Sequence, residues 1–134
     1  MKKWRILALL LAVAFCLQGI AFAADTPEKG YANYQKSIKS AAKLDDITKY
    51  VCKDQVEALN KMSKEKRDSI LPTLKQFAPI SYSVTKSEIK GNNATLIVKG
   101  KAKNFFSGKV EDSNGEVSMK KEAGVWKLVE ESWK

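Results

Sequence analysis

The residues able to do chemistry are few, and every histidine-dependent chemistry is absent from the chain. The sequence contains no His, which removes the commonest general base and metal ligand. Ser–His and Cys–His nucleophile systems are therefore excluded within this chain. A zinc site needs clustered Cys and His ligands, and the glycines stand at turns or inside strands rather than in a phosphate-binding loop before a helix. We expect no metal and no cofactor.

Carboxylates are the remaining acid–base candidates. Asp45-Asp46 and Glu130-Glu131 are adjacent pairs, and neighbours on a strand face opposite sides of a sheet. We expect them to cap helices or face solvent. No acid stands between apolar strand residues, where burial would raise its pKa. Glu88 and Glu111 are the least unfavourable candidates for a base, although polar residues flank both.

Tyrosine hydroxyls could assist a carboxylate, but their positions favour a structural role. Tyrosines on an amphipathic stripe usually lie in the core with the hydroxyl at its edge. We expect this of Tyr31, Tyr34, Tyr50 and Tyr82. With no acid–base pair assembled, the sequence predicts a protein that is not an enzyme.

The first 23 residues have the pattern of a secretory signal peptide. Lys2, Lys3 and Arg5 precede the apolar run 6–16, and Ala21-Phe22-Ala23 gives the small–x–small pattern of a cleavage site. The run is shorter than the roughly 20 apolar residues of a membrane span. We expect cleavage between Ala23 and Ala24, and a periplasmic or secreted domain of residues 24–134 with no transmembrane segment.

The two cysteines raise separate questions. Lipid attachment at Cys16 normally needs a small preceding residue, and the bulky Phe15 argues against it. Cys52 is then the one cysteine of the exported domain, so that domain has no internal disulfide. A lone thiol in an oxidising compartment is buried or paired with another chain. We expect Cys52 to be a core thiol because Tyr50 and Val51 precede it.

The charge is basic but dispersed. The net charge is +9, and loss of three basic residues with the signal leaves +6, which favours anionic partners. The lysines alternate with acidic residues, and Arg67 is the one arginine after residue 23. Nucleic-acid readers usually cluster basic residues and use arginine. We therefore expect an ordinary solvated basic surface and no nucleic-acid partner.

The exported domain divides into a helical half and a strand-rich half. Thr26-Pro27-Glu28 is a helix start, and apolar residues then recur at helical spacing. Three further helices are expected from residues 45, 54 and 63, with Pro72 kinking or limiting the last one. Pro79 marks its end.

After Pro79 the apolar period changes from 3.6 to 2. We expect strands from residue 80, from residue 95, from Val117 and over 125–129, with turns at 91–93, 112–115 and 123–124. The second strand should bend through Phe105-Phe106. Trp126 and Leu128 share one face of the closing strand. The fold class is therefore α+β, with N-terminal helices packed on a curved antiparallel sheet of about four strands.

The chain resembles secreted bacterial domains of the nuclear-transport-factor-2-like (cystatin-like) superfamily, near the lumazine-binding-like group. The resemblance covers most of residues 24–134. It depends on the helix around 31–34, the step at 44–47, the segment 93–100 and above all the closing segment 117–128. It implies a curved sheet wrapped over helices with a conical pocket at one end. The superfamily includes isomerases, dehydratases, transport factors and domains without a known ligand.

A pocket between helices and sheet is the first binding hypothesis. Gly100 and Ala102 lie on the helix-facing side of the second strand, where small side chains leave room. Gly100 could instead mark a bend, with Ala102 packed against a bulky side chain. The expected lining is Tyr34, Ile38, Phe77, Tyr82, Gly100, Ala102, Trp126 and Leu128.

The outer face of the sheet is the second binding hypothesis. It would carry Ile97, Val125 and Val129 as an apolar patch bordered by Lys99 and Lys101, suited to a homodimer or an envelope protein. The sequence thus predicts an exported, non-catalytic domain that binds a small apolar ligand or acts as an envelope interaction module. The alternative that the resemblance implies is an isomerase- or dehydratase-like enzyme with a pocket carboxylate and a tyrosine.

Overall fold

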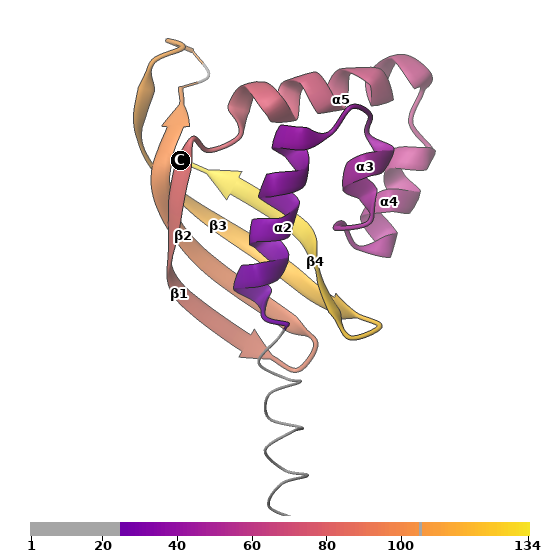
Figure 1. Ribbon diagram of the computed structural model, residues 1–134, viewed down its shortest axis with the longest axis vertical. Coiled ribbons are helices and arrows are strands. Elements are labelled where there is room, and N and C mark those ends of the chain that lie inside the picture. The colour runs from indigo at the N-terminus through magenta and orange to yellow at the C-terminus, as the bar shows by residue number, and fades with distance from the viewer. Residues whose placement is uncertain (1–24, 105) are drawn as a thin grey trace, which may run out of the picture.

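The computed structural model describes residues 25–104 and 106–134. Helices precede an antiparallel sheet of four strands, so the predicted α+β fold class is confirmed. Figure 1 shows α2 lying across one face of the curved sheet, with the remaining helices at one end. Cys16 and the predicted cleavage residues Ala21, Ala23 and Ala24 lie outside the described residues.

Two of the four described helices, the first and the last, begin where capping side chains predict, whereas the two short helices between them have no side-chain cap. Helix α2 (Pro27–Ser40) begins after Thr26, whose hydroxyl accepts a hydrogen bond from the Lys29 backbone N–H at 3.2 Å. Short helices follow as α3 (Asp45–Thr48) and α4 (Lys53–Asn60). Helix α5 (Lys64–Phe77) begins after Ser63 and contains Pro72 in its interior. Pro72 therefore does not mark the start of a shortened helix.

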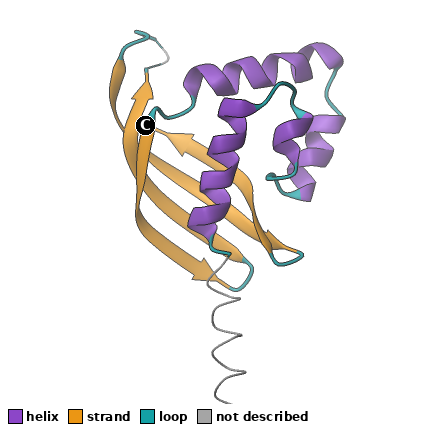
Figure 2. Ribbon diagram, viewed as in Figure 1, coloured by secondary structure: helices purple, strands orange, loops and turns teal. Residues whose placement is uncertain are grey.

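The sheet has the order β1-β2-β3-β4, and each strand is antiparallel to its neighbour. The strands are β1 (Ser81–Lys90), β2 (Asn93–Lys103), β3 (Val110–Glu122) and β4 (Val125–Trp133). Figure 2 shows the helices gathered on one side of this sheet. The β3–β4 turn has positive φ at Ala123 (50°) and Gly124 (79°), as its sequence predicts.

One predicted turn is wrong. Residues 112–115 lie inside β3 and pair with β2 along their length. The chain turns earlier, over 104–109, where the Asn104 carboxamide oxygen accepts hydrogen bonds from the backbone N–H groups of Phe106 and Ser107. Gly115 is needed within the strand for a different reason: a Cβ there would lie 2.7 Å from Val98 and 2.9 Å from Trp133.

The core lies between α2 and the sheet. The face of α2 that bears Tyr31, Tyr34 and Ile38 is buried with the inward residues of the strands. At Gly30 the helix approaches β4 so closely that a Cβ would lie 2.6 Å from the Trp126 carbonyl oxygen. Trp126 and Leu128 are 4% and 6% exposed, so the predicted helix–sheet core is confirmed. Cys52 is buried and free, as expected of a core thiol.

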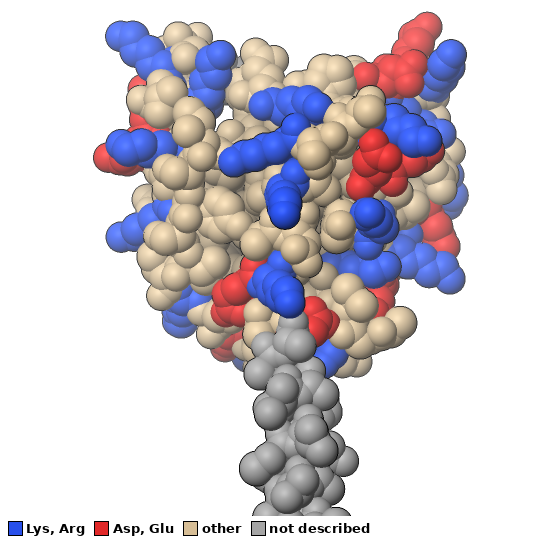
Figure 3. Space-filling view, in the orientation of Figure 1, with Lys and Arg blue, Asp and Glu red and all other residues tan. Residues whose placement is uncertain are grey.

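Charged side chains cover the outside of this core. Figure 3 shows Lys and Arg spread over the helical face with Asp and Glu among them. Among the described residues the ion pairs join Arg67 to Asp45, Lys90 to Glu88 and Lys101 to Asp112. All three involve well-exposed carboxylates, so each contributes little to stability.

Candidate functional site

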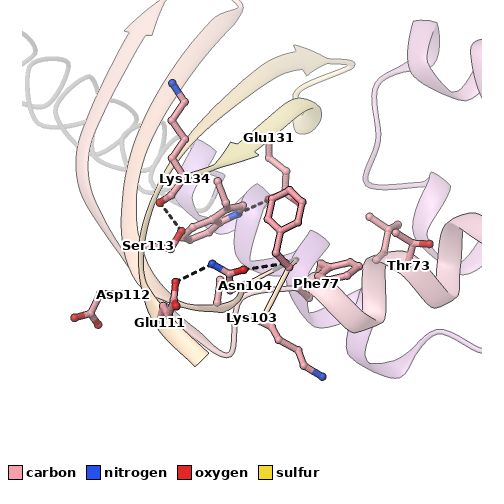
Figure 4. Close-up of a pocket in the computed structure, with 14 residues that line it drawn as sticks. Thr73, Phe77, Lys103, Asn104, Glu111, Asp112, Ser113, Glu131 and Lys134 are labelled. Atoms are coloured by element: carbon pink, nitrogen blue, oxygen red, sulfur yellow. Dashed lines mark hydrogen bonds between the residues drawn. The ribbon is translucent and has the colours of Figure 1, made fainter. Parts of the chain in front are cut away.

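A cavity of about 560 Å³ lies between the C-terminal half of α5 and the end of the sheet. Ligand pockets commonly have volumes of roughly 300–1,000 Å³. Its apolar walls come from α5 (Leu74 and Phe77) and the following residue Ala78, from β2 (Ala102), from the β2–β3 loop (Phe106) and from β4 (Trp133). Figure 4 shows Glu131 on β4 and Phe77 on α5 at different sides of this space, with Ser113 and Glu111 on the side of the sheet.

A β-bulge places Glu131 in this cavity. Leu128 pairs with Met119 and Glu130 with Ser118, so Val129 has no Cα partner on β3. An extra residue shifts the alternation of a strand by one position. Before the bulge Trp126 and Leu128 face the helices; after it Glu131 and Trp133 do. Without the bulge Glu130 would occupy the inner face.

The Glu131 carboxylate has one bonded oxygen and one unbonded oxygen. Oε2 accepts hydrogen bonds from the Tyr31 hydroxyl at 2.8 Å, the Gln35 amide at 3.1 Å and the Trp133 indole N–H at 3.4 Å. The Gln35 amide also donates to the Tyr31 hydroxyl at 2.9 Å. Oε1 accepts no hydrogen bond from any residue that the structure describes. The network fixes the carboxylate in place and leaves one oxygen for a ligand.

Burial controls the electrostatics of this network. Removal from water raises the pKa of the Glu131 carboxyl, and the hydrogen bonds from Tyr31, Trp133 and Gln35 partly oppose that rise. Burial, together with the negative charge of Glu131, also raises the pKa values of Tyr31 and Tyr34 far above the ordinary value of 10.0. Tyr31 therefore keeps its proton and acts as a donor to Glu131.

The expectation that no acid is buried on a strand is therefore wrong. Glu131 was expected in solvent because the closing strand was expected to end at Val129, whereas β4 continues through a bulge to Trp133. The sequence does carry a signal for the bulge: Trp126 and Trp133 stand an odd number of residues apart, so both can face the helices only if the alternation changes phase between them. Such a phase change within a strand indicates a bulge.

The other acids considered from the sequence lie outside the Glu131 network. Glu111 is exposed at the cavity rim, where it accepts a hydrogen bond from the Asn104 amide at 2.9 Å. Glu88 is exposed and pairs with Lys90 at 3.4 Å. Asp46 accepts hydrogen bonds from the backbone N–H groups of Ala42 and Lys43, which lower the pKa of its carboxyl. Asp46 thus organises the turn before α3.

The polar side chains around the cavity are largely engaged with the protein. The Thr73 hydroxyl donates to the Ser69 carbonyl at 2.8 Å, and the Ser113 hydroxyl donates to the Lys134 carbonyl at 2.8 Å. Figure 4 shows Asp112, Lys103 and Lys134 turned away from the space between Phe77 and Glu131. The charged group that faces this space is Glu131.

The predicted pocket residues separate into two groups. Phe77 and Ala102 line the cavity. The other group lies in or against the packed core: Tyr34, Ile38, Trp126 and Leu128 are buried there, and Tyr82 packs on Tyr31 edge to face with ring centroids 5.0 Å apart. Gly100 does not line this cavity but, with Tyr82, a separate and more open one of about 610 Å³ along β1, β2 and β3. A Cβ at Gly100 would collide with the Ser81 carbonyl oxygen. Glycine at this position allows β1 to approach β2.

The predicted partner face lies on the side of the sheet away from the helices. Lys99 and Lys101 are exposed, Ile97 and Val129 are half-buried, and Val125 is 46% exposed. The three aliphatic residues do not adjoin one another. Ile97 has Glu116 as its cross-strand neighbour, Val129 lies at the bulge beside Ser118, and Val125 stands at the β3–β4 turn.

The described part of the chain has neither a cluster of metal ligands nor a membrane-spanning helix. Within residues 25–104 and 106–134, no three His, Cys, Asp or Glu side chains are grouped as metal ligands. No helix in the same part of the chain is both long and apolar enough to cross a membrane.

Comparisons with known proteins inform the fold alone. No family model matches the chain, and no curated protein sequence matches it. The solution structure of a SEC-C motif containing protein from Rhodopseudomonas palustris is similar with a TM-score of 0.50 and 15% identity, over 76% of this chain and 70% of that one. The intermembrane space region of the chloroplast protein ARC6 has a TM-score of 0.38 at 14% identity, over 79% of this chain and 92% of that region. At such identities the likeness to the first structure supports an α+β arrangement of helices before a sheet.

Proposed function

We propose that this chain is an exported, non-catalytic domain that binds a small apolar or amphipathic molecule in the cavity beneath α5. The observation that carries the proposal is an apolar cavity of about 560 Å³ with a single inward carboxylate, whose Oε1 has no partner among the described residues. Mostly apolar walls with a few placed polar groups are typical of small-molecule sites. The curved sheet and cavity also agree with the conical pocket that the nuclear-transport-factor-2-like resemblance implies.

Filling the cavity tests this proposal. N-phenyl-1-naphthylamine is neutral and apolar, and its fluorescence increases when it leaves water. Ala102→Trp places an indole between β2 and α5 and should weaken probe binding at least tenfold. Thr95→Leu, on the opposite face of the same strand, is the matched control and should bind as the wild type does. Absence of binding to the wild type, or equal binding by Ala102→Trp, contradicts the proposal.

Export has its own test, because it depends on the N-terminal sequence pattern alone. The full chain is produced in a bacterial host, and the periplasm, medium and cytosol are separated. Intact-mass measurement should find a species that begins at Ala24 outside the cytosol. A cytosolic protein that retains Met1, or an acylated N-terminus at Cys16, contradicts this part of the proposal.

An acid–base enzyme is the second candidate, and Glu131 is the observation that favours it. A cavity-lining carboxyl whose pKa is raised by burial, with one oxygen that has no donor among the described residues, is suited to removing a proton from a substrate. The isomerase chemistry that the resemblance implies also needs a donor for the developing oxyanion. Tyr31 is 0% exposed and donates to Glu131 itself, and the Thr73 and Ser113 hydroxyls donate to backbone carbonyls. For this reason we rank ligand binding above catalysis.

Proton exchange separates these two functions. A hydrophobic ketone of cavity size is incubated with the protein in deuterated water, and loss of the protons beside the carbonyl is followed by NMR. Catalysis predicts exchange that Glu131→Gln abolishes. Binding alone predicts exchange at the rate of buffer, with the ketone still bound.

A further inference from the structure

We infer that the cavity selects an organic cation, with an alkylammonium N–H donating to Glu131 Oε1 and the hydrocarbon part lying against Phe77 and Trp133. This inference rests on the proposed function and names the chemical class of its ligand. It is carried by the unbonded carboxylate oxygen, the aromatic walls and the orientation of the nearby charges.

The hydrogen bonding of the Glu131 carboxylate favours a positively charged donor as the ligand. A buried charge is costly unless it is paired and hydrogen-bonded. Glu131 Oε2 receives three donors, from α2 and from β4 itself, whereas Oε1 receives none among the described residues. A ligand that supplies both a donor and a positive charge therefore relieves the cost of the ionised carboxylate. A neutral hydroxyl supplies the donor alone, and an anion supplies neither.

The surrounding charges reinforce this selection. Lys103, Lys134 and Asp112 point away from the centre of the cavity. Glu111 stands at the rim and is held by Asn104. The local field in the cavity is thus negative, although the chain as a whole has a net charge of +9. A low-dielectric cavity with one sign of charge attracts the opposite sign.

The aromatic walls of the cavity also favour a cation. Phe77 from α5 and Trp133 from β4 line the same cavity as Glu131. Aromatic faces attract ammonium groups, and the attraction is stronger when the cation is desolvated. Gly115 supports the position of Trp133, because any side chain there would collide with the indole. A carboxylate beside aromatic rings recognises a cation with an apolar body.

A structural role for Glu131 makes a different prediction. If the carboxylate served only to hold Tyr31 and Gln35, glutamine would accept the same donors through its carbonyl oxygen. The variant Glu131→Gln would then leave ligand preference unchanged. If Glu131 recognises a cation, the same substitution removes the preference while the cavity remains.

Isothermal titration with three probes of one chain length tests the inference. Octylammonium, octanol and octanoate are titrated at neutral pH into the wild type, Glu131→Gln and the control Glu88→Gln, which removes an exposed carboxylate of β1 that does not line the cavity. We expect the wild type and Glu88→Gln to bind octylammonium at least tenfold more tightly than octanol, and octanoate least. Glu131→Gln should bind octylammonium and octanol alike.

The outcomes distinguish this inference from the function on which it depends. If octanol or octanoate binds the wild type as tightly as octylammonium, the cavity binds ligands but the cation inference fails. Unchanged selectivity in a folded Glu131→Gln, checked by circular dichroism, also overturns it. If no probe binds, N-phenyl-1-naphthylamine included, the proposed function itself fails.

Discussion

The two halves of the helix–sheet interface differ in packing: the half under α2 is close-packed, and the half under α5 contains a cavity. In the half under α2, the inward residues are apolar and buried, including Met119, Leu128 and Trp126, and Gly30 lets the backbones nearly touch. In the half under α5, Ala102 and Ser113 face a cavity of about 560 Å³. One sheet thus provides a sealed core at one end and an open site at the other.

The bulge at Val129 marks the boundary between these halves. Before it β4 contributes Leu128 to the core, and after it β4 contributes Glu131 and Trp133 to the cavity. Glu131 has Val117, a fully buried residue, as its cross-strand neighbour. A carboxylate beside the core costs stability because burial disfavours its charged form, and the proposed ligand binding would account for that cost.

Truncating one leucine in each half should give the largest contrast. Leu128→Ala leaves a void in a close-packed region and should lower the free energy of unfolding by about 3 kcal/mol. Leu74 is half-buried at the cavity wall, so Leu74→Ala should cost about 1 kcal/mol because its neighbours are already incompletely packed. Urea denaturation measures both. Equal losses would show that the α5 half is as tightly packed as the α2 half.

A single methyl group at Gly30 should have the next largest effect. Gly to Ala inside a helix normally stabilises by about 1 kcal/mol. Here the new Cβ would lie 2.6 Å from the Trp126 carbonyl oxygen, so we expect Gly30→Ala to destabilise by about 2 kcal/mol. Asn33→Ala, on the exposed face of the same helix, is the control and should be neutral or slightly stabilising. A stabilised Gly30→Ala would mean that α2 lies farther from β4.

The packed half was more predictable from sequence than the open half, and the reason is periodicity. Thr26 and Ser63 identified two helix starts, and alternation assigned Trp126 and Leu128 to the inner face. Each of these signals is local. The cavity depends on where α5 comes to rest relative to β2, which no local pattern specifies.

The predicted turn at 112–115 and the solvent assignment of Glu131 were wrong for a common reason: in both places an irregularity of a strand was misinterpreted. Residues 112–115 have turn-forming composition but form a strand, because Gly115 provides space for Trp133 rather than a change of direction. Glu131 was assigned to solvent because the closing strand was expected to end at Val129, where the structure has a bulge and a further stretch of strand. The role of a glycine or of a phase change within a strand can be assigned only when the residues of the neighbouring strand are known.

Replacing the Glu131 carboxylate should change stability less than the substitutions at Leu128 and Gly30, and should stabilise the protein rather than destabilise it. Glu131→Gln keeps the shape and removes the buried charge, so we expect the variant to be more stable at neutral pH by about 1 kcal/mol. The groups that face Glu131 are Tyr31, Tyr34 and Gln35 from α2, Tyr82 from β1 and Trp133 from β4. None of these carries a charge at neutral pH.

The pH dependence follows from the direction of the pKa shift. Because the pKa of Glu131 in the folded protein lies above its ordinary value of 4.5, the folded state binds more protons than the unfolded state between these two values. Wild-type stability should therefore fall as pH rises through this window, relative to Glu131→Gln. Denaturation from about pH 4 to about pH 8 measures the difference. A constant difference would show that Glu131 is solvated.

The outer face of the sheet should respond least, which sets it apart from both inner halves. Ile97, Val125 and Val129 are separated by Glu116, Ser118 and the length of β4, so they present no continuous apolar patch of the kind that marks an interface. We expect Val129→Lys to change stability by less than about 0.5 kcal/mol, and light scattering to give a monomer for both proteins at high concentration. A wild-type dimer that Val129→Lys dissociates would instead support the envelope interaction module, with Lys99 and Lys101 at its border. In that event the cavity and the outer face would be two separate sites, and Ala102→Trp should leave the dimer intact.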